Sequence, residues 1–345
     1  MKSRVRRGLF CFWAVTVAVV GQVALAHADP GVLEAIRARG HVLCGVGSGP
    51  KGYSSVDAQG TWTGLSVDFC RALAVAVLGN KSAVVFRTPS GEDDFQALRS
   101  GEIDVLSRNV GMTAQLDMSL GLRFAGVLVY EGQGFMVRKA HNITSALELS
   151  AARICAASDG PAGPVLSDYF AGLKMPFDLV KADRWPDAVT AYAGKNCQAL
   201  TGDLAALAEA RQGFPDADEH VILPEVALKI PAGPMVRQGD EDWFSVVRWT
   251  LYALIAAEEL GITSANADAV KTAGSPDARR FLTGDKDPGK RLGLPTDWTY
   301  RVVRQIGNYG ELFERYLGPK SPLKLDRRLN NLWSKGGLHY SPPFR

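Results

Sequence analysis

The sequence predicts an α/β protein with open sheets flanked by helices, organised as two lobes that are joined by two crossings. Short apolar strands alternate with amphipathic helices along most of the chain, which is the pattern of β-α-β units. A strand pattern at 130–138 leads into a second block of this alternation, and a pattern at 227–236 runs back from it. We therefore expect the second lobe as an insertion into the first.

The first lobe is expected to start with short, alternating elements. In chain order these are a strand at 41–46, a hairpin at 53–62, a helix stopped at 79–80, a strand at 84–87, a helix at 93–100 and a strand at 103–106. The first helix is predicted because Phe69, Leu73 and Val77 fall on one face and because Gly79 follows the last apolar residue.

The second lobe repeats the alternation before the chain returns. We expect strands at 153–157, 179–181, 199–201 and 221–223 and helices at 165–172 and 186–194. A long helix at 240–259 follows, with an apolar face made by Trp243, Val247, Leu251 and Leu254 and a stop at Gly261. The tail at 298–317 is predicted to be helical, and a shorter turn is expected at 329–333.

The first 28 residues have the composition of a secretory signal. Four positive charges open the chain, an apolar run occupies 9–20, and small-residue cleavage sites lie at 24–26 and 26–28. The apolar run is too short for a convincing membrane span, and Cys11 does not follow a cleavage site as a lipid-anchored cysteine would. We therefore predict a soluble, exported protein of a bacterial periplasm.

Removing this segment changes what the net charge implies. The 345-residue chain carries a formal charge of +3, and four positive charges with no acid precede residue 28, so the mature chain is at −1. A nucleic-acid binder needs a basic field, which this mature chain lacks. A mature chain of roughly 315 residues is also long enough for two compact lobes.

Four cysteines remain in the mature chain: Cys44, Cys70, Cys155 and Cys197. An oxidising compartment favours disulfides, and four thiols allow three connectivities. Sequential pairing would place one bridge in each half of the chain. No close C-x-x-C pair is present, so we expect no zinc site.

Six stretches of the sequence have a recognisable pattern, at 62–70, 101–109, 132–139, 253–261, 307–315 and 332–338. These stretches resemble the general L-amino-acid binding proteins of bacterial ABC importers, and the four cysteines also match the positions of that family. The resemblance covers nearly the whole mature chain. It implies a two-lobe fold of the type II periplasmic-binding-protein kind, with two hinge crossings and a solute cleft between the lobes.

This resemblance implies an organisation and a set of partners. The boundaries that we expect are a signal at 1–28, the first part of lobe 1 at 29–137, lobe 2 at 138–230, and the return of lobe 1 with a C-terminal helical segment at 231–345. The partners would be a small-molecule solute and a membrane permease, with a monomer as the expected state. No cofactor is expected, because Pro50 and a hairpin follow the glycines at 45, 47 and 49, where a dinucleotide loop would need a helix.

The resemblance also implies where an amino acid would bind. Asp203 matches the acidic partner of the solute ammonium group, although a residue before Leu204 could instead cap a helix. Tyr53 and Phe95 match aromatic pocket positions, with core packing as the alternative. The remaining candidates are the loop residues Asn109, Gly111, Thr113, Ser158 and Gly160.

The first half of the carboxylate cradle departs from the family. Leu116 occupies the position of the arginine that binds the carboxylate, and Met118, the alternative register, is not basic. Thr113 still offers a hydroxyl. Loss of such an arginine from a buried charge pair costs roughly 2–5 kcal/mol, which is about 30-fold to several-thousand-fold in affinity.

The second half of the cradle also departs from the family. The threonines that follow Ser-Gly are replaced by a Ser158–Gly163 stretch in which Asp159 adds a negative charge and Pro161 has no N–H. We expect Asp159 to be a helix N-cap and Pro161 the first helical residue. Arg108 and Arg123 are not expected to compensate, so the sequence favours a cationic or neutral solute.

Two other classes of function remain open. Some exported proteins of this architecture resemble dehydratases, for which Glu131 and the run Glu92-Asp93-Asp94 are the available carboxylates. We expect that run to be the solvated start of a helix. A third possibility is a degenerate receptor that acts as a sensor or partner protein.

Overall fold

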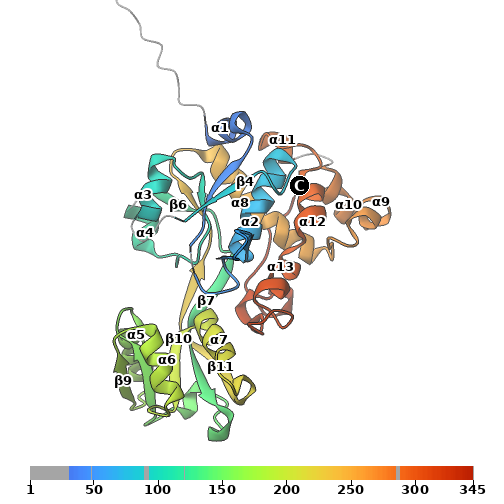
Figure 1. Ribbon diagram of the computed structural model, residues 1–345. Helices are drawn as coiled ribbons and strands as arrows, with labels where there is room; N and C mark the ends of the chain where they lie inside the picture. Colours follow the sequence, from blue (N-terminus) through green and yellow to red (C-terminus); the bar gives the residue numbers. More distant parts are fainter. Residues whose placement is uncertain (1–30, 48, 89–92, 120, 285–287, 345) are drawn as a thin grey trace, which may run out of the picture. The chain divides into compact units, whose positions relative to one another are not determined.

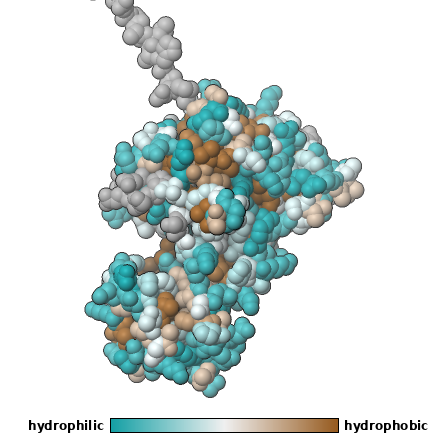
Figure 2. Space-filling model, in the orientation of Figure 1, coloured by the Kyte–Doolittle hydropathy of each residue, from teal (hydrophilic) through white to brown (hydrophobic). Residues whose placement is uncertain are grey.

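The computed structural model describes residues 31–47, 49–88, 93–119, 121–284 and 288–344, and residues 31–345 group as one compact unit. The predicted signal segment lies outside the described residues. Within the described ranges, none of the helices combines the length and the apolarity that crossing a membrane requires. On the face drawn in Figure 2, hydrophilic residues cover most of the surface and hydrophobic residues form separate patches.

The first sheet is built from strands that lie far apart in the sequence. Its order is β4 (Val84–Arg87), β1 (Val42–Gly45), β5 (Val105–Leu106), β12 (Met235–Arg237) and β6 (Leu122–Phe124). Strand β1 runs parallel to both β4 and β5, whereas β12 runs antiparallel to β5 and β6. The chain therefore has to return after residue 232 to complete this sheet, as the predicted insertion requires.

The helices of this half pack on the sheet and on one another. They are α1 (Val32–Arg39), α2 (Leu65–Leu78), α3 (Asp93–Ser100), α4 (Ala114–Ser119) and α8 (Glu241–Glu259), and α2 packs against both β1 and α8. A small antiparallel hairpin of β2 (Ser55–Val56) and β3 (Trp62–Thr63) precedes α2 and confirms the hairpin prediction. The helices predicted at 93–100 and 240–259 are also confirmed.

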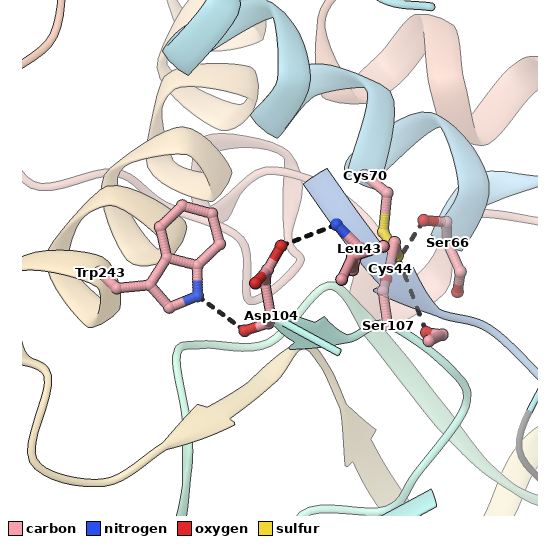
Figure 3. Close-up of a disulfide and its surroundings, with 8 residues drawn as sticks. Leu43, Cys44, Ser66, Cys70, Asp104, Ser107 and Trp243 are labelled. Atoms are coloured by element: carbon pink, nitrogen blue, oxygen red, sulfur yellow. Dashed lines mark hydrogen bonds between the residues drawn. A yellow bond between two sulfur atoms is a disulfide. The ribbon is translucent and has the colours of Figure 1, made fainter. Parts of the chain in front are cut away.

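A disulfide between Cys44 and Cys70 ties β1 to α2 (Figure 3). Nearby, the Asp104 carboxylate accepts a hydrogen bond from the Leu43 N–H at 2.7 Å, and the Trp243 indole donates to the Asp104 carbonyl at 2.8 Å. These bonds and the disulfide tie β1 and the residue before β5 to helices α2 and α8.

The second sheet has the order β11 (His220–Ala232), β7 (Val129–Arg138), β10 (Ala199–Asp203), β8 (Arg153–Ala157) and β9 (Asp178–Ala182). Strands β8, β9 and β10 are parallel, and β7 is antiparallel to β10 and β11. Helices α5 (Ala162–Gly172), α6 (Trp185–Ala193) and α7 (Leu204–Gln212) pack on these strands. The second disulfide joins Cys155 to Cys197, so the sequential pairing is confirmed.

Strands β7 and β11 connect the two sheets (Figure 1). Strand β7 follows β6 of the first sheet, and β11 leads directly into β12. The expected separate strands at 221–223 and 227–236 are wrong in detail, because β11 is one strand that runs through Pro224 and ends at Ala232. The strand shows register shifts between Ile222 and Leu228. Proline has no N–H to donate, and a bulge accommodates it because the residue at a bulge makes no ladder hydrogen bond.

The C-terminal region consists of short helices. They are α9 (Ala267–Ala273), α10 (Pro276–Thr283), α11 (Pro288–Arg291), α12 (Trp298–Ile306) and α13 (Tyr309–Tyr316), followed by 3₁₀ turns at Arg328–Asn330 and Trp333–Lys335. Further 3₁₀ turns lie at Lys139–His141, Ala146–Glu148 and Ala217–Glu219. The helical tail predicted at 298–317 is confirmed, but it consists of two helices, α12 and α13. Gly307, at φ 106°, ends α12, and Asn308 begins α13 with a capping box that includes Glu311.

Two buried polar side chains hold this region to the rest of the fold. Arg327 forms a bidentate pair with Glu258 at 2.8 and 3.1 Å, and its guanidinium lies 5.3 Å from the Tyr309 ring centre. His339 is 2% exposed and packs between the rings of Tyr130 and Tyr309 at 5.0 and 4.3 Å. Burial lowers the pKa of His339 to about 3, with the positive Arg327 as a second cause.

Candidate functional site

A buried tyrosine and a buried glutamate meet where the chain crosses between the sheets. Tyr53, 2% exposed, donates its hydroxyl hydrogen bond to Glu131 on β7. The Gly132 N–H donates to the other Glu131 oxygen at 3.2 Å. Both side chains line a cavity of about 590 Å³, whose other walls come from α13, β11 and the segment 325–331. Tyr53 is thus a buried wall residue whose hydroxyl is already bonded.

The environment of Glu131 favours its neutral form. Burial is the largest cause that raises its pKa, to about 7, and the nearby negative charge of Asp203 adds to the rise. The hydrogen bonds from Tyr53 and Gly132 oppose it, because they stabilise the carboxylate. Glu131 is therefore poised to change its charge near neutral pH.

This shift predicts a pH dependence of stability that Glu131→Gln removes. Folded Glu131 holds its proton up to about pH 7, while the unfolded residue loses it near 4.5. The folded state thus binds more protons in this window, so the free energy of unfolding falls as pH rises through it, by up to about 3 kcal/mol. Urea unfolding at pH 5 and pH 8 should show a smaller decrease in Glu131→Gln than in the wild type. Glu102→Gln, an exposed control, should behave as the wild type, and an equal decrease in all three proteins would contradict the prediction.

Asp203 is the last residue of β10 and directly precedes α7. The sequence analysis left two roles open for it, partner of the solute ammonium group and helix N-cap. It is the N-cap residue, but its side chain makes no capping hydrogen bond. The residue is exposed, yet surrounding protein atoms desolvate its carboxyl enough to raise its pKa. Trp185 packs over the adjacent Gly202, where a β-carbon would lie 2.5 Å from the indole. Because side chains alternate along a strand, the Asp203 carboxyl points to the opposite face, near Glu131, whose pKa its charge raises, and its oxygens are unbonded to any described residue.

A cation that the sequence interpretation missed lines the same cavity as the second candidate loop. Ser158 and Gly160 line a cavity of about 320 Å³, together with Lys181 of β9. Lys181 pairs in register with Ala156 of β8, so the two strands bring the ammonium group to the loop that follows β8. No sequence spacing marks this lysine, because it belongs to the neighbouring strand.

The helix that follows this loop starts before the predicted range 165–172 but one residue after Pro161. Helix α5 begins at Ala162, and its N-cap residue is Pro161, which offers no capping side chain. The predictions of Asp159 as N-cap and Pro161 as first helical residue are therefore wrong. The buried Gln133 amide holds the start of α5 by donating to the Ala162 carbonyl at 3.1 Å and to the Thr201 hydroxyl at 3.1 Å.

The residues of the first candidate loop lie in structural positions. The Thr113 hydroxyl accepts from the Leu116 N–H at 3.2 Å and so caps α4. Leu116 and Phe95 both pack against an apolar cluster that includes Leu106 and Phe124. Met118 is 77% exposed.

The same loop contacts the returning strand β11. Gly111 bridges to Ala232, and a β-carbon on Gly111 would lie 2.6 Å from Ile230. Asn109 is half-buried beside it. This close approach explains why a glycine stands at position 111.

The two neighbouring arginines are both paired. Arg108 forms an ion pair with Asp94, which is fully buried, so the expectation that the 92–94 run is solvated is wrong for Asp94. One terminal nitrogen of Arg123 donates to both Glu241 carboxylate oxygens at 2.7 and 2.8 Å, and the guanidinium lies over the Phe244 ring at 3.8 Å. Within the described ranges, no three His, Cys, Asp or Glu side chains gather as a metal site would require.

Comparison with known proteins agrees with this two-lobe arrangement. The chain belongs to the bacterial extracellular solute-binding proteins, family 3, whose pattern it matches over residues 42–265. It is 46% identical over 330 residues to the general L-amino acid-binding periplasmic protein AapJ of Rhizobium johnstonii, covering 95% of this chain and 97% of that protein. It is 41% identical over 334 residues to the glutamate/glutamine/aspartate/asparagine-binding protein BztA of Rhodobacter capsulatus, covering 95% and 99%.

A solved relative extends this comparison to the structure. A periplasmic binding protein of an ABC transporter from Brucella ovis, with glutathione bound, is 43% identical and superimposes with a TM-score of 0.78. The match covers 92% of this chain and all of that chain. The family and these relatives identify a small-solute receptor of an ABC importer and do not favour the dehydratase alternative.

Proposed function

We propose that this chain is a periplasmic receptor that captures an amino-acid-like solute between its lobes and delivers it to a membrane permease. The proposal places the signal at 1–28, lobe 1 at 29–137 and 231–345, and lobe 2 at 138–230. The observation that carries it is the Asp203 carboxyl, which is exposed, is unbonded to described residues and lies near Glu131, whose pKa its charge raises. An unpaired carboxylate at this place suits a solute ammonium group.

The opposite end of the solute would meet the loop that follows β8. The sequence favoured a cationic or neutral solute because both halves of the carboxylate cradle had changed. Lys181 supplies a positive charge at the second half, in the cavity that Ser158 and Gly160 line. The first half stays apolar at Leu116, which packs into the core. The chemistry therefore fits a zwitterion whose anionic group lies against lobe 2.

The names of the relatives narrow the choice of solutes to test. AapJ and BztA are named for amino acids, and the Brucella ovis protein holds glutathione, whose α-amino acid end carries an ammonium and a carboxylate. We propose the same class for this chain, with a small peptide such as glutathione as favourable as a free amino acid. Catalysis is not part of the proposal, so mass spectrometry should recover the solute unchanged.

The test is a thermal-shift screen of the mature chain against L-amino acids, glutathione, amines and small acids. Asp203→Asn should lower the affinity for the solute that binds best by roughly 30-fold to several-thousand-fold, because it removes one partner of a desolvated charge pair. The melting temperature without solute should not fall and should rise slightly at neutral pH, because the Asp203 side chain caps nothing and its desolvated charge lies near Glu131.

Asp168→Asn is the matched control, an exposed substitution on α5. It should bind as the wild type does. If Asp203→Asn keeps full affinity, the ammonium assignment fails, and if no solute shifts the wild type, the receptor proposal fails. Binding of a standard L-amino acid at high affinity would remove the case for an altered solute.

A further inference from the structure

A second cavity lies on the first lobe, between α2, β4, α12 and α13. It measures about 470 Å³, and its walls include three cationic side chains from three separate segments, Arg71, Lys81 and Arg315. None of the candidate solute residues lines it. The cavity is independent of the proposed function, because it is built within one sheet and the helices that pack on it.

The single carboxylate in its lining is already bonded to three donors. Asp68 is 5% exposed and accepts from Arg71 at 2.8 Å, from Arg315 at 2.6 Å and from the Tyr316 hydroxyl at 2.7 Å. These bonds fix both guanidinium groups at the rim and occupy three of the roughly four acceptor sites of the Asp68 carboxylate. Three cations against one anion leave the cavity with an excess of two positive charges.

Donors remain free around this fixed framework. The exposed Lys81 ammonium makes no ion pair or hydrogen bond with any described residue. The terminal nitrogens of Arg71 donate to Asp68 and to the Trp62 carbonyl. Those of Arg315 donate to Asp68 and to the Ile306 carbonyl. The Nε of each arginine donates to none of the described residues. The cavity is thus rich in donors and poor in acceptors.

One wall of the cavity is apolar. The rings of Trp62 and Phe86 lie 5.9 Å apart, and the Arg71 guanidinium lies 5.6 Å from the Phe86 ring centre. Val84 and Ile306 continue this wall. A site that joins fixed cations to an aromatic surface suits an anion with an apolar body, because each part meets its complement.

We propose that this cavity binds a small organic oxyanion, a carboxylate or a phosphate ester, at a site separate from the transported solute. The anion would accept hydrogen bonds from the Lys81 ammonium and the free guanidinium N–H groups. Its apolar part would lie on Trp62 and Phe86.

The test uses the full mature chain and two probes, inorganic phosphate and phenyl phosphate, in isothermal titration at low and high salt. Phenyl phosphate should bind more tightly than phosphate, since only it reaches the aromatic wall, and added salt should weaken both. Benzoate in place of phenyl phosphate distinguishes a carboxylate from a phosphate preference.

Variants separate this site from general charge and from the solute cleft. Lys81→Glu should lower the affinity for phenyl phosphate by at least about tenfold, because it replaces a free donor by a negative charge that repels the anion. Lys320→Glu, an exposed substitution outside the cavity with the same charge change, should leave binding intact, and so should Asp203→Asn. Absence of saturable binding to the wild type, or equal loss in Lys81→Glu and Lys320→Glu, would overturn the proposal.

Discussion

Replacing Arg327 by methionine should lower the free energy of unfolding by about 3–5 kcal/mol, because the substitution leaves a buried carboxylate without its partner. Arg327 and Glu258 have side-chain exposures of only 13% and 10%. The Arg327 guanidinium also donates to the Asn330 carbonyl at 2.7 Å, so it holds the C-terminal segment against α8 and α13. Urea unfolding at neutral pH measures the loss.

Two comparisons isolate the cause of that loss. Arg184→Met breaks an exposed pair with Asp187, and the expected change is within about 0.5 kcal/mol. Adding Glu258→Leu to Arg327→Met should recover part of the stability, since the unpaired charge is then gone. Equal destabilisation by Arg327→Met and Arg184→Met would contradict the assigned role of the buried pair.

Acid should destabilise the protein through His339, and His339→Phe should remove this effect. The unfolded residue takes up a proton below about pH 6.5, whereas the folded one stays neutral until about pH 3. The unfolded state therefore binds more protons in this window, and the free energy of unfolding falls by about 1.4 kcal/mol for each pH unit below 6.5. By pH 4.5 the loss is roughly 3 kcal/mol.

Urea unfolding at pH 7, 5.5 and 4.5 compares the wild type with His339→Phe and His339→Gln. Phenylalanine keeps the stacking with Tyr130 and Tyr309, and glutamine tests whether the ring itself matters. Glu131 shifts stability in the opposite sense between pH 4.5 and 7, but all three proteins contain it, so its contribution cancels. An unchanged pH slope in both variants would refute the assignment to His339.

Periodicity predicted the regular parts of the fold because those parts depend on local patterns. The strand at 84–87, the helix at 93–100 and the long helix before Gly261 follow from apolar spacing and glycine stops. The break between α12 and α13 was missed because the apolar face continues across it. Gly307 and the capping box of Asn308 and Glu311 mark it in the sequence.

The candidate site was harder to predict because its contacts join distant segments. Asp94 carries a charge and looked solvated, yet it is buried against Arg108 from the loop after β5. Lys181 reaches the Ser158 loop only through strand pairing with β8, and Glu131 depends on Tyr53 from 78 residues earlier. Such pairings are set by sheet order and register, which local sequence does not encode.

The way β12 completes the first sheet has a consequence for the order of folding. Strands β7 to β11 form one continuous stretch of sequence, so that ladder can close as soon as residue 232 is free. The first sheet has to wait for residues 235–237, and Asp240 must also be present to accept the Val32 N–H at 2.7 Å and start α8. When the chain emerges from its N-terminus, the second sheet can therefore be completed before the first. Until residues 235–237 emerge, strands β1, β4 and β5 are exposed to incorrect pairing.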